Sequence, residues 1–339
     1  MQVHGVCYDV GRVMLGQDWR PDWAAVDVER EIAIIREDLH CNAIRICGQD
    51  LDRLALAADS ALRQGLEVWW SPELWDASQA STLTYIEEAA RRAEELRARH
   101  PGKVVLSVGS ELTLFMQGLV PGDNVLARLQ HPSFWETVRS GGHNGPLNAF
   151  LAEAAASARR VYHGPLTYAS VPLESVAWEA FDVVSVDLYR EARIRDAYPS
   201  LLHRFMAHGH PLVVTEFGCC TYRGAAAAGG QGWAIVDPAT TPPTWRGTFE
   251  RDEEEQAREL TDVLTIMGDE GVRGAFVMTF VAPTLPTSDD PRFDLDMASY
   301  SLVKSFRDRS GAAYPGLPWD PKASFTAVAH YYADHPPQA

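Results

Sequence analysis

Two kinds of apolar pattern alternate along the chain. Short, mainly apolar runs such as VVLSV at 104–108 recur, and most are followed by longer stretches with apolar residues three or four positions apart. A short run is typical of a strand buried on both faces of a parallel sheet, and the wider spacing is typical of an amphipathic helix. The predicted strands are residues 3–8, 43–47, 66–71, 103–111, 166–170, 182–187, 211–218 and 274–281.

The helical pattern is clearest at 81–99. Leu83, Ile86 and Ala90 share one face of this segment, while Glu87 and Arg91 form an i,i+4 pair on the other, as expected for a helix with one solvent-exposed side. The last helix is expected to start after Asp320 as its N-cap, with Pro321 at the first helical position. The predicted helices are residues 24–39, 50–64, 81–99, 147–162, 199–208, 252–267 and 321–333.

Eight strands that alternate with helices, without an internal linker, predict an α/β protein. We expect a single (β/α)8 TIM barrel over residues 1–339, with long loops after strands four, seven and eight. The loops at 112–146 and 219–249 are longer than ordinary connections, and loops of that length are usually functional. In such barrels the active site lies at the carboxyl ends of the strands.

The composition narrows the choice of ligand. A formal net charge of −16 argues against nucleic acid or an anionic membrane as a partner, because either would be repelled from most of the surface. An uncharged or cationic small molecule or oligosaccharide is favoured instead. The chain has no apolar run of 18 residues and no signal-peptide pattern, so the sequence predicts a soluble, cytoplasmic protein. The oligomeric state is left open.

Cysteine and histidine patterns do not indicate disulfides or a metal. The five cysteines are an odd number without paired spacing. Cys219 and Cys220 follow the TEFG segment, where pocket lining is a commoner role than a reactive thiol. Neither HxH after the first strand nor HExxH on a helix is present, so we expect no catalytic metal and no cofactor.

Two strands each deliver a glutamate to the same end of the predicted barrel. Glu111 ends the segment KVVLSVGSE, and Glu216 lies near the end of PLVVTEFG. Cleavage of a glycosidic bond needs one protonated carboxyl to protonate the leaving oxygen and one ionised carboxylate to attack or to activate water. The alternative is structural, since a glutamate at a strand end can simply satisfy a buried arginine or backbone amides.

With these positions, the chain resembles the retaining (β/α)8 glycoside hydrolases of clan A. That resemblance implies an acid/base glutamate after strand four, here Glu111, and a nucleophile after strand seven, here Glu216. It also implies that Arg45 on strand two and Tyr189 on strand six hydrogen-bond the nucleophile. The segments SLVK and PKASFTAVAHYY are similar to the family's closing segment, in which a Pro-Lys pair starts the last helix.

The resemblance also suggests substrate contacts. Ser110 stands where the family usually has an asparagine, and Phe280 is the aromatic residue in FVMTFV, where the family usually offers a tryptophan floor. Tyr8 and Trp70 are expected at the mouth, and Trp233 in the loop after strand seven could stack on a sugar face. Packing within the core is the alternative role for the tryptophans and for Tyr189.

The leading hypothesis is a retaining glycoside hydrolase or transglycosylase that acts through two glutamates without a cofactor. One alternative is a glycosidase-like barrel that carries out a non-hydrolytic tailoring reaction on a specialised metabolite. A second is a carbohydrate-binding barrel without activity, which two mutually repelling carboxylates at one mouth would not favour.

Overall fold

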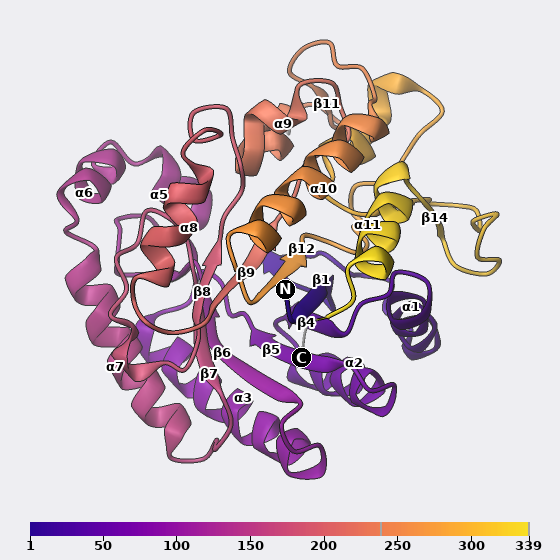
Figure 1. Cartoon of the computed structure of the whole chain (residues 1–339). Coiled ribbons are helices and arrows are strands. Elements are labelled where there is room, and N and C mark those ends of the chain that lie inside the picture. The colour runs from indigo at the N-terminus through magenta and orange to yellow at the C-terminus, as the bar shows by residue number, and fades with distance from the viewer. Residues whose placement is uncertain (238, 338–339) are drawn as a thin grey trace.

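The computed structural model describes residues 1–237 and 239–337, and its centre is a closed barrel of eight parallel strands (Figure 1). Around the barrel the strand order is β1-β12-β9-β8-β7-β6-β5-β4, so each strand pairs with its neighbour in the chain and the last strand closes on the first. The predicted (β/α)8 fold is therefore confirmed. The barrel strands are β1 (Val3–Asp9), β4 (Ala43–Gly48), β5 (Glu67–Pro72), β6 (Val104–Ser110), β7 (Leu166–Ser170), β8 (Val184–Asp187), β9 (Leu212–Phe217) and β12 (Gly274–Val277).

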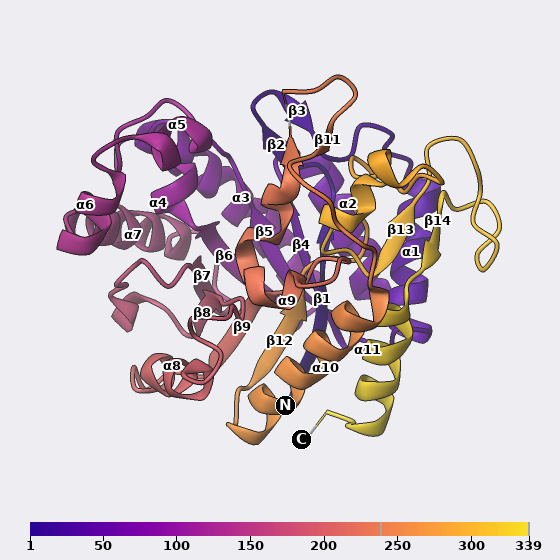
Figure 2. The same ribbon diagram turned by 90° about the horizontal axis from the view of Figure 1, so that it is seen from above.

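Helices surround these strands, as Figures 1 and 2 show from two directions. Capping side chains mark several starts: Asp50 accepts from two backbone amides of the first turn of α2, and Ser78 and Asp252 cap α3 and α10. The outer helices are α1 (Ala25–Glu37), α2 (Leu51–Arg63), α3 (Gln79–Arg99), α7 (Asn144–Arg159), α8 (Tyr198–Met206), α10 (Glu253–Asp269) and α11 (Ala323–Asp334). The connection from β7 to β8 contains a short 3₁₀ turn, η1 (Trp178–Ala180).

The structure differs from the sequence-based expectation mainly in one loop, at the last helix and at the end of strand eight. The loop at 112–146 is more ordered than predicted and contains α4 (Leu112–Phe115), α5 (Val125–Gln130) and α6 (Phe134–Ser140). Asp320 does not cap the last helix, because it pairs with Lys304 in a short antiparallel ribbon of β13 (Val303–Ser305) and β14 (Trp319–Pro321). Strand eight ends at Val277, four residues earlier than predicted.

Short elements occupy the loops at the carboxyl ends of the strands. The loop after β1 holds the β2–β3 ribbon, the loop after β9 holds α9, η2 and the β10–β11 ribbon, and the loop after β12 holds η3 and η4. Their bounds are β2 (Val13–Met14), β3 (Gln17–Asp18), α9 (Ala225–Ala228), η2 (Gly229–Ile235), β10 (Val236–Asp237), β11 (Thr244–Trp245), η3 (Pro291–Phe293) and η4 (Leu295–Ala298).

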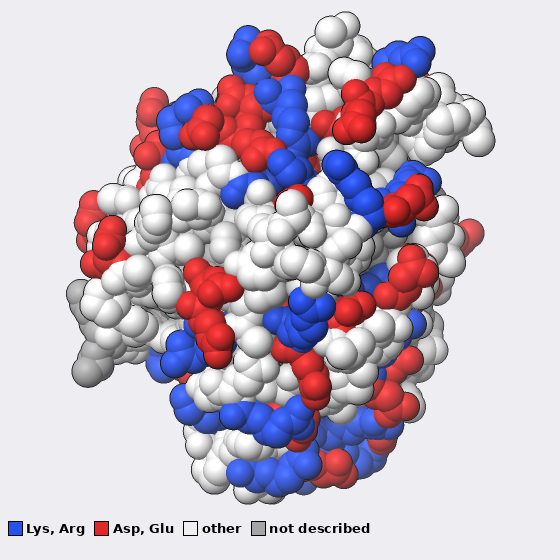
Figure 3. All heavy atoms as spheres, turned by 90° about the vertical axis from the view of Figure 1, so that its right-hand side faces the viewer, with Lys and Arg blue, Asp and Glu red and all other residues white. Residues whose placement is uncertain are grey.

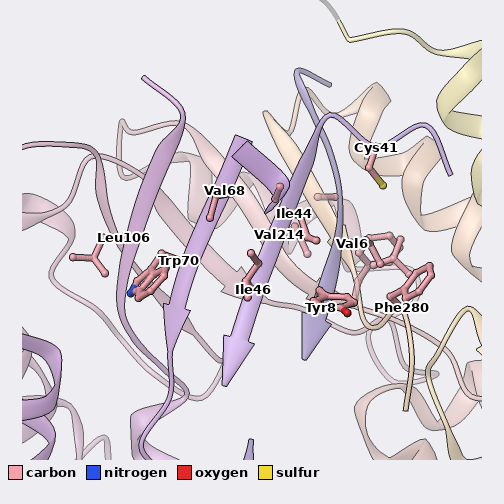
Figure 4. Packing of buried hydrophobic residues seen from close by; sticks show 14 of the residues in the cluster. Val6, Tyr8, Cys41, Ile44, Ile46, Val68, Trp70, Leu106, Val214 and Phe280 are labelled. Carbon is pink, nitrogen blue, oxygen red and sulfur yellow. The ribbon is translucent and has the colours of Figure 1, made fainter. Parts of the chain in front are cut away.

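Strand side chains alternate between the barrel interior and the layer beneath the helices. Cys7, Arg45 and Trp69 are neighbours in register, and all three point inward. The next residues along the same strands point outward into the larger core, where Figure 4 shows Tyr8, Ile46 and Trp70 among aliphatic side chains. The apolar interior of the barrel consists of Val3, Cys7, Ala43, Trp69, Val105, Val183, Val213 and Phe276.

A buried ion cluster ties the last helix to two loops at the mouth. The Lys322 Nζ atom lies 2.9 Å from Asp296 Oδ2, and Arg251 Nη2 lies 2.7 Å from the same oxygen. Lys322 also donates to the hydroxyl of Thr221 at 2.9 Å. Lys322 and Asp296 are almost fully buried, so this pairing positions the loops after β9 and β12 against the start of α11.

Charged side chains of both signs are interspersed on the face of the molecule drawn in Figure 3. The net charge of −16 is therefore not gathered into a single acidic patch on that face. Across residues 1–237 and 239–337, no helix is both long and apolar enough to span a bilayer.

Candidate active site

Glu216 lies near the end of β9, the seventh barrel strand, and its carboxylate is held by three side chains. Arg45 Nη1 donates to Oε1 at 2.5 Å, and Arg12 Nη2 donates to the same oxygen at 2.8 Å. The Tyr189 hydroxyl donates to Oε2 at 3.0 Å. The structure thus brings together the three residues that the sequence predicted here, Glu216, Arg45 and Tyr189, and adds Arg12.

Arg12 belongs to a buried network that the sequence analysis missed. Its Nε and Nη2 atoms donate to the two carboxylate oxygens of Glu73 at 2.7 and 3.0 Å. Arg45 Nη2 lies 3.3 Å from Glu73 Oε1, so this glutamate bridges both arginines. The side chain of Asp9 fixes the turn that presents Arg12, because its Oδ1 accepts from the backbone amides of Gly11 and Arg12.

These arginines keep Glu216 ionised. Burial alone would raise the pKa of Glu216, which is only 8% exposed. The positive charges and hydrogen bonds of Arg12 and Arg45 outweigh that effect, and the pKa of the carboxyl lies below its ordinary value. Glu216 therefore has the charge state that a nucleophile needs.

Glu111 follows β6, the fourth barrel strand, in an unusual backbone conformation. Its φ and ψ of 46° and 43° are left-handed, which costs a residue other than glycine roughly 1–2 kcal/mol. Surrounding hydrogen bonds hold the turn: the Glu111 amide donates to the Ala169 carbonyl, and the next amide, of Leu112, donates to the Tyr168 hydroxyl. Glu174 accepts from the Thr113 amide and from Tyr168, which fixes the start of α4. Strain maintained in this way is a feature of functional sites.

The half-buried Glu111 has the opposite electrostatic environment from Glu216. Burial raises the pKa of its carboxyl well above the ordinary value, and the negative charges of Asp187 and Glu216 raise it further. Arg12 opposes this shift only weakly. The two strand ends therefore shift their carboxyl pKa values in opposite directions.

Ser110 connects the two strand ends through hydrogen bonds. Its Oγ accepts from Arg45 Nη2 at 3.2 Å and donates to Asp187 Oδ2 at 3.0 Å. The serine is almost fully buried. Ser110 thus lies among the charged residues at the strand ends, and its contact with substrate stays a prediction. Asp187 is a further acidic residue that the sequence analysis did not single out.

Three partly exposed aromatic side chains lie beside Arg12. The rings of Trp75 and Phe115 stack with centroids 4.0 Å apart, and the Trp19 ring meets Trp75 edge-on at 5.4 Å. The Arg12 guanidinium carbon lies 5.7 Å from the centroid of Trp75. Such rings can stack on the apolar face of a sugar.

Three of the predicted substrate contacts do not lie at the mouth, and those predictions are wrong. Tyr8 points away from the barrel interior and donates to Glu31 on α1. Trp70 is fully buried in the layer between the barrel and the helices. Phe280 packs against Tyr8 and Trp319 in that layer (Figure 4). Because strand side chains alternate, a shift of one position exchanges the two faces.

At the end of β12, Met278 and not Phe280 approaches the charged network. Its sulfur lies 3.8 Å from Arg12 Nη1. Trp233 lies on η2 and is 42% exposed, so it is free to contact a ligand. The same segment packs over the site, because Gly230 lies against the Tyr189 ring.

Cys219 and Cys220 do not line the mouth. Both are fully buried in a cluster with Tyr222 and Met297, and burial raises the pKa of each thiol. Neither thiol is therefore set up as a nucleophile. In the part of the chain that the structure describes, no group of three His, Cys, Asp or Glu side chains is arranged to hold a metal ion.

Comparisons with solved structures show the same fold. A GH113 β-1,4-mannanase superposes with a TM-score of 0.60 at 14% identity, covering 99% of this chain and 100% of the mannanase. A GH113 β-mannanase from Alicyclobacillus acidocaldarius, in complex with ManMIm, gives 0.61 at 16% identity, covering 98% and 97%. A β-glucuronidase from Ruminococcus gnavus, in complex with D-glucaro 1,5-lactone, gives 0.55 at 15% identity; it covers 98% of this chain, which spans 49% of that protein.

Neither the protein-family models nor the curated proteins include a match to this sequence. At 14–16% identity the structural matches show the fold alone. The chain therefore has the same (β/α)8 barrel fold as these proteins.

Proposed function

We propose that the chain is a retaining glycoside hydrolase or transglycosylase with Glu216 as nucleophile and Glu111 as acid/base. The observation that carries this proposal is the contrast between the two carboxyl environments: Glu216 accepts hydrogen bonds from Arg12, Arg45 and Tyr189, whereas the largest charge effects on Glu111 come from other carboxylates. The pKa of Glu216 is lowered by two guanidinium groups, while burial and neighbouring carboxylates raise that of Glu111. Environments that separate two carboxyl pKa values assign the acid and the nucleophile.

The reaction would proceed in two displacements. In the first, a Glu216 oxygen attacks the anomeric carbon and the glycosidic C–O bond breaks, while the Glu111 proton passes to the leaving oxygen. In the second, Glu111, now ionised, takes a proton from water, or from a sugar hydroxyl in transglycosylation. The resulting oxygen attacks the anomeric carbon, the bond to Glu216 breaks, and both carboxyls return to their starting states.

Charges at the mouth favour a neutral glycoside. Arg12 and Arg45 direct hydrogen bonds to Glu73 and Glu216, so their charges are already balanced. Glu111 adds a further carboxyl, so a substrate carboxylate would meet more negative than positive charge. Of the neighbours, the mannanases act on a neutral sugar, and a neutral β-mannoside is the first substrate to test.

The test is turnover of aryl β-glycosides by the wild type and by Glu216→Gln and Glu111→Gln. Glu88→Gln, on the exposed face of α3, is the matched control. We expect each site variant to lose at least about a hundredfold in kcat, consistent with the size of acid–base contributions. ¹H NMR of the first product should show the anomeric configuration of the substrate, and azide should rescue a Glu111→Ala variant.

Inversion at the anomeric carbon would refute the double-displacement mechanism. Turnover that survives both Gln substitutions would refute the assignment of the two glutamates. If no glycoside is hydrolysed and the protein binds a sugar-free metabolite tightly, the tailoring hypothesis replaces hydrolysis.

A further inference from the structure

Asp187 is a buried carboxyl that the proposed two-glutamate chemistry leaves without a role. It ends β8, and its Cα pairs with that of Glu216 across the β8–β9 ladder, beside a shift in register. The residue is 1% exposed. Ser110 donates to Oδ2 at 3.0 Å, and the Thr215 hydroxyl on β9 is a second hydrogen-bonding group beside the carboxyl.

No direct ion pair stabilises a negative charge on Asp187. Among residues 1–237 and 239–337, no Lys or Arg nitrogen lies within 4.0 Å of its carboxylate, and its nearest link to a cation is the path through Ser110 to Arg45. Burial therefore raises the pKa of this carboxyl, and hydrogen bonds rather than a direct ion pair stabilise its negative charge. A structural residue at this position would be better served by asparagine, which can satisfy the same serine without a charge.

Neighbouring elements present both signs of charge to Asp187. Arg45 on β4 lowers its pKa, while burial and the charge of Glu216 on β9 raise it, to about 7 overall. Glu111 directly follows Ser110, the residue that donates to Asp187, and after burial the charge of Asp187 is the largest effect that raises the Glu111 pKa. On the remaining neighbour, β7, the Ser170 hydroxyl donates to the Ser185 carbonyl and carries no charge.

Acidic side chains outnumber the two arginines at the mouth of the barrel. The two arginines face the carboxyls of Glu73, Glu216 and Asp9, so Glu111 and Asp187 are two further acidic groups at a mouth where the positive charges are already balanced. Two carboxyls in that position do not both ionise near neutral pH; they titrate as a pair.

We propose that Asp187 and Glu111 share one proton, so that Asp187 is a positioning residue whose negative charge keeps the proton on Glu111. This inference rests on the proposed function. Before bond cleavage the charge on Asp187 holds Glu111 in its acid form. After Glu111 has given up its proton, the same charge makes it a stronger base toward the incoming water.

The test is a carboxyl titration that needs no substrate. Wild type, Asp187→Asn and the exposed control Asp52→Asn are labelled with ¹³C at the Asp and Glu carboxyls, and the Glu111 signal is assigned from its loss in Glu111→Gln. We expect the Glu111 titration to move to lower pH by about one unit or more in Asp187→Asn, because a negative neighbour is gone, and to stay in place in the control. An unchanged Glu111 titration, or one that moves to higher pH, overturns the proposal.

A second variant covers the case in which Asp187→Asn does not fold. Ser110→Ala removes the hydrogen bond that lowers the pKa of Asp187, so the Asp187 signal should titrate at higher pH and the Glu111 signal at lower pH. If neither signal moves, the two carboxyls do not share a proton.

Activity then separates this inference from the proposed function. In an active enzyme, the basic limb of the kcat/KM profile should follow the Glu111 titration and move to lower pH in Asp187→Asn. A fall in kcat at every pH without a moved limb indicates a purely structural role and overturns the proposal. If the wild type hydrolyses no glycoside, the proposed function fails, while the NMR titration still decides whether the proton is shared.

Discussion

Replacing Arg12 by methionine tests whether the buried network is held by charge balance. Arg12 is 3% exposed, and its guanidinium makes three hydrogen bonds to carboxylates, two to Glu73 and one to Glu216. Methionine fills similar space without a charge, so the substitution leaves two carboxylates short of a partner. Removing one side of a buried ion pair costs about 3–5 kcal/mol, and we expect a loss of that size in the free energy of unfolding at pH 7.

Adding Glu73→Gln to Arg12→Met should recover part of the loss. The second substitution removes one unpaired charge, and a hydrogen bond to a charged group accounts for about 1.5–3 kcal/mol. The double variant should therefore be more stable than the single variant by about 1–3 kcal/mol, a coupling typical of residues in one network. Arg91→Met is the matched control, because Arg91 pairs with Glu87 on the exposed face of α3 and should cost less than about 1 kcal/mol.

Urea unfolding followed by tryptophan fluorescence and far-UV circular dichroism measures these free energies, provided that the two transitions coincide. The deficit of Arg12→Met should shrink as the pH falls, because loss of the guanidinium raises the pKa of Glu216 and protonation then removes the unpaired charge. The reasoning is refuted if Arg12→Met costs no more than Arg91→Met, or if the double variant is less stable than Arg12→Met alone.

Three further predictions concern single residues. Tyr189→Phe removes the hydroxyl that donates to Glu216, so the acid limb of the kcat/KM profile should move to higher pH by up to about one unit. An acid limb at the same pH would show that this hydrogen bond does not stabilise ionised Glu216. Burial lowers the pKa of His4 to about 4, so the free energy of unfolding should decrease as the pH falls from 6.5 toward 4. His4→Phe should make the free energy of unfolding depend less on pH in this range. An equal pH dependence in the variant would show that His4 is not its cause. Gly311→Ala should lower the thermal midpoint, because a Cβ would lie 1.9 Å from the Trp319 carbonyl oxygen. Gly145→Ala, with open space at the start of α7, should raise the midpoint slightly. Changes of the opposite sign in the two variants would contradict this packing.

The fold was predictable because every barrel strand carries its own apolar run. Helix faces such as that of α3 were equally clear, since a solvent-exposed helix must show both an apolar and a charged side. The loop after β6 was not predictable in the same way. Its helices α4, α5 and α6 are only four to seven residues long, too short for a periodic pattern.

The side on which a strand residue lies was harder to predict. A strand buried on both faces is apolar at every position, so the pattern does not reveal which residues face inward. Arg45 indicates which positions of β4 face inward, because a charged residue in this strand must point toward partners in the barrel interior. Its register neighbours Cys7 and Trp69 then point inward, and Tyr8 and Trp70 outward.

The residues missed at the site lie just beyond strand ends. Arg12 comes three residues after β1, and Glu73 directly follows β5. Nothing in their local sequence shows that they meet, because that contact depends on the closure of the barrel. A buried arginine such as Arg45 that is shared by two carboxylates does, however, imply a second cation nearby to balance the charge.

The pairing of β1 with β12 has a consequence for synthesis of the chain. Val3 pairs with Gly274, so seven of the eight barrel strands are synthesised before β1 can pair with β12 and close the barrel. During that interval one edge of β1 lacks its final neighbour, and an unpaired edge can recruit other strands. We therefore expect nascent fragments that stop before residue 274 to depend on chaperones for protection from aggregation, and the dependence to end once β12 has emerged.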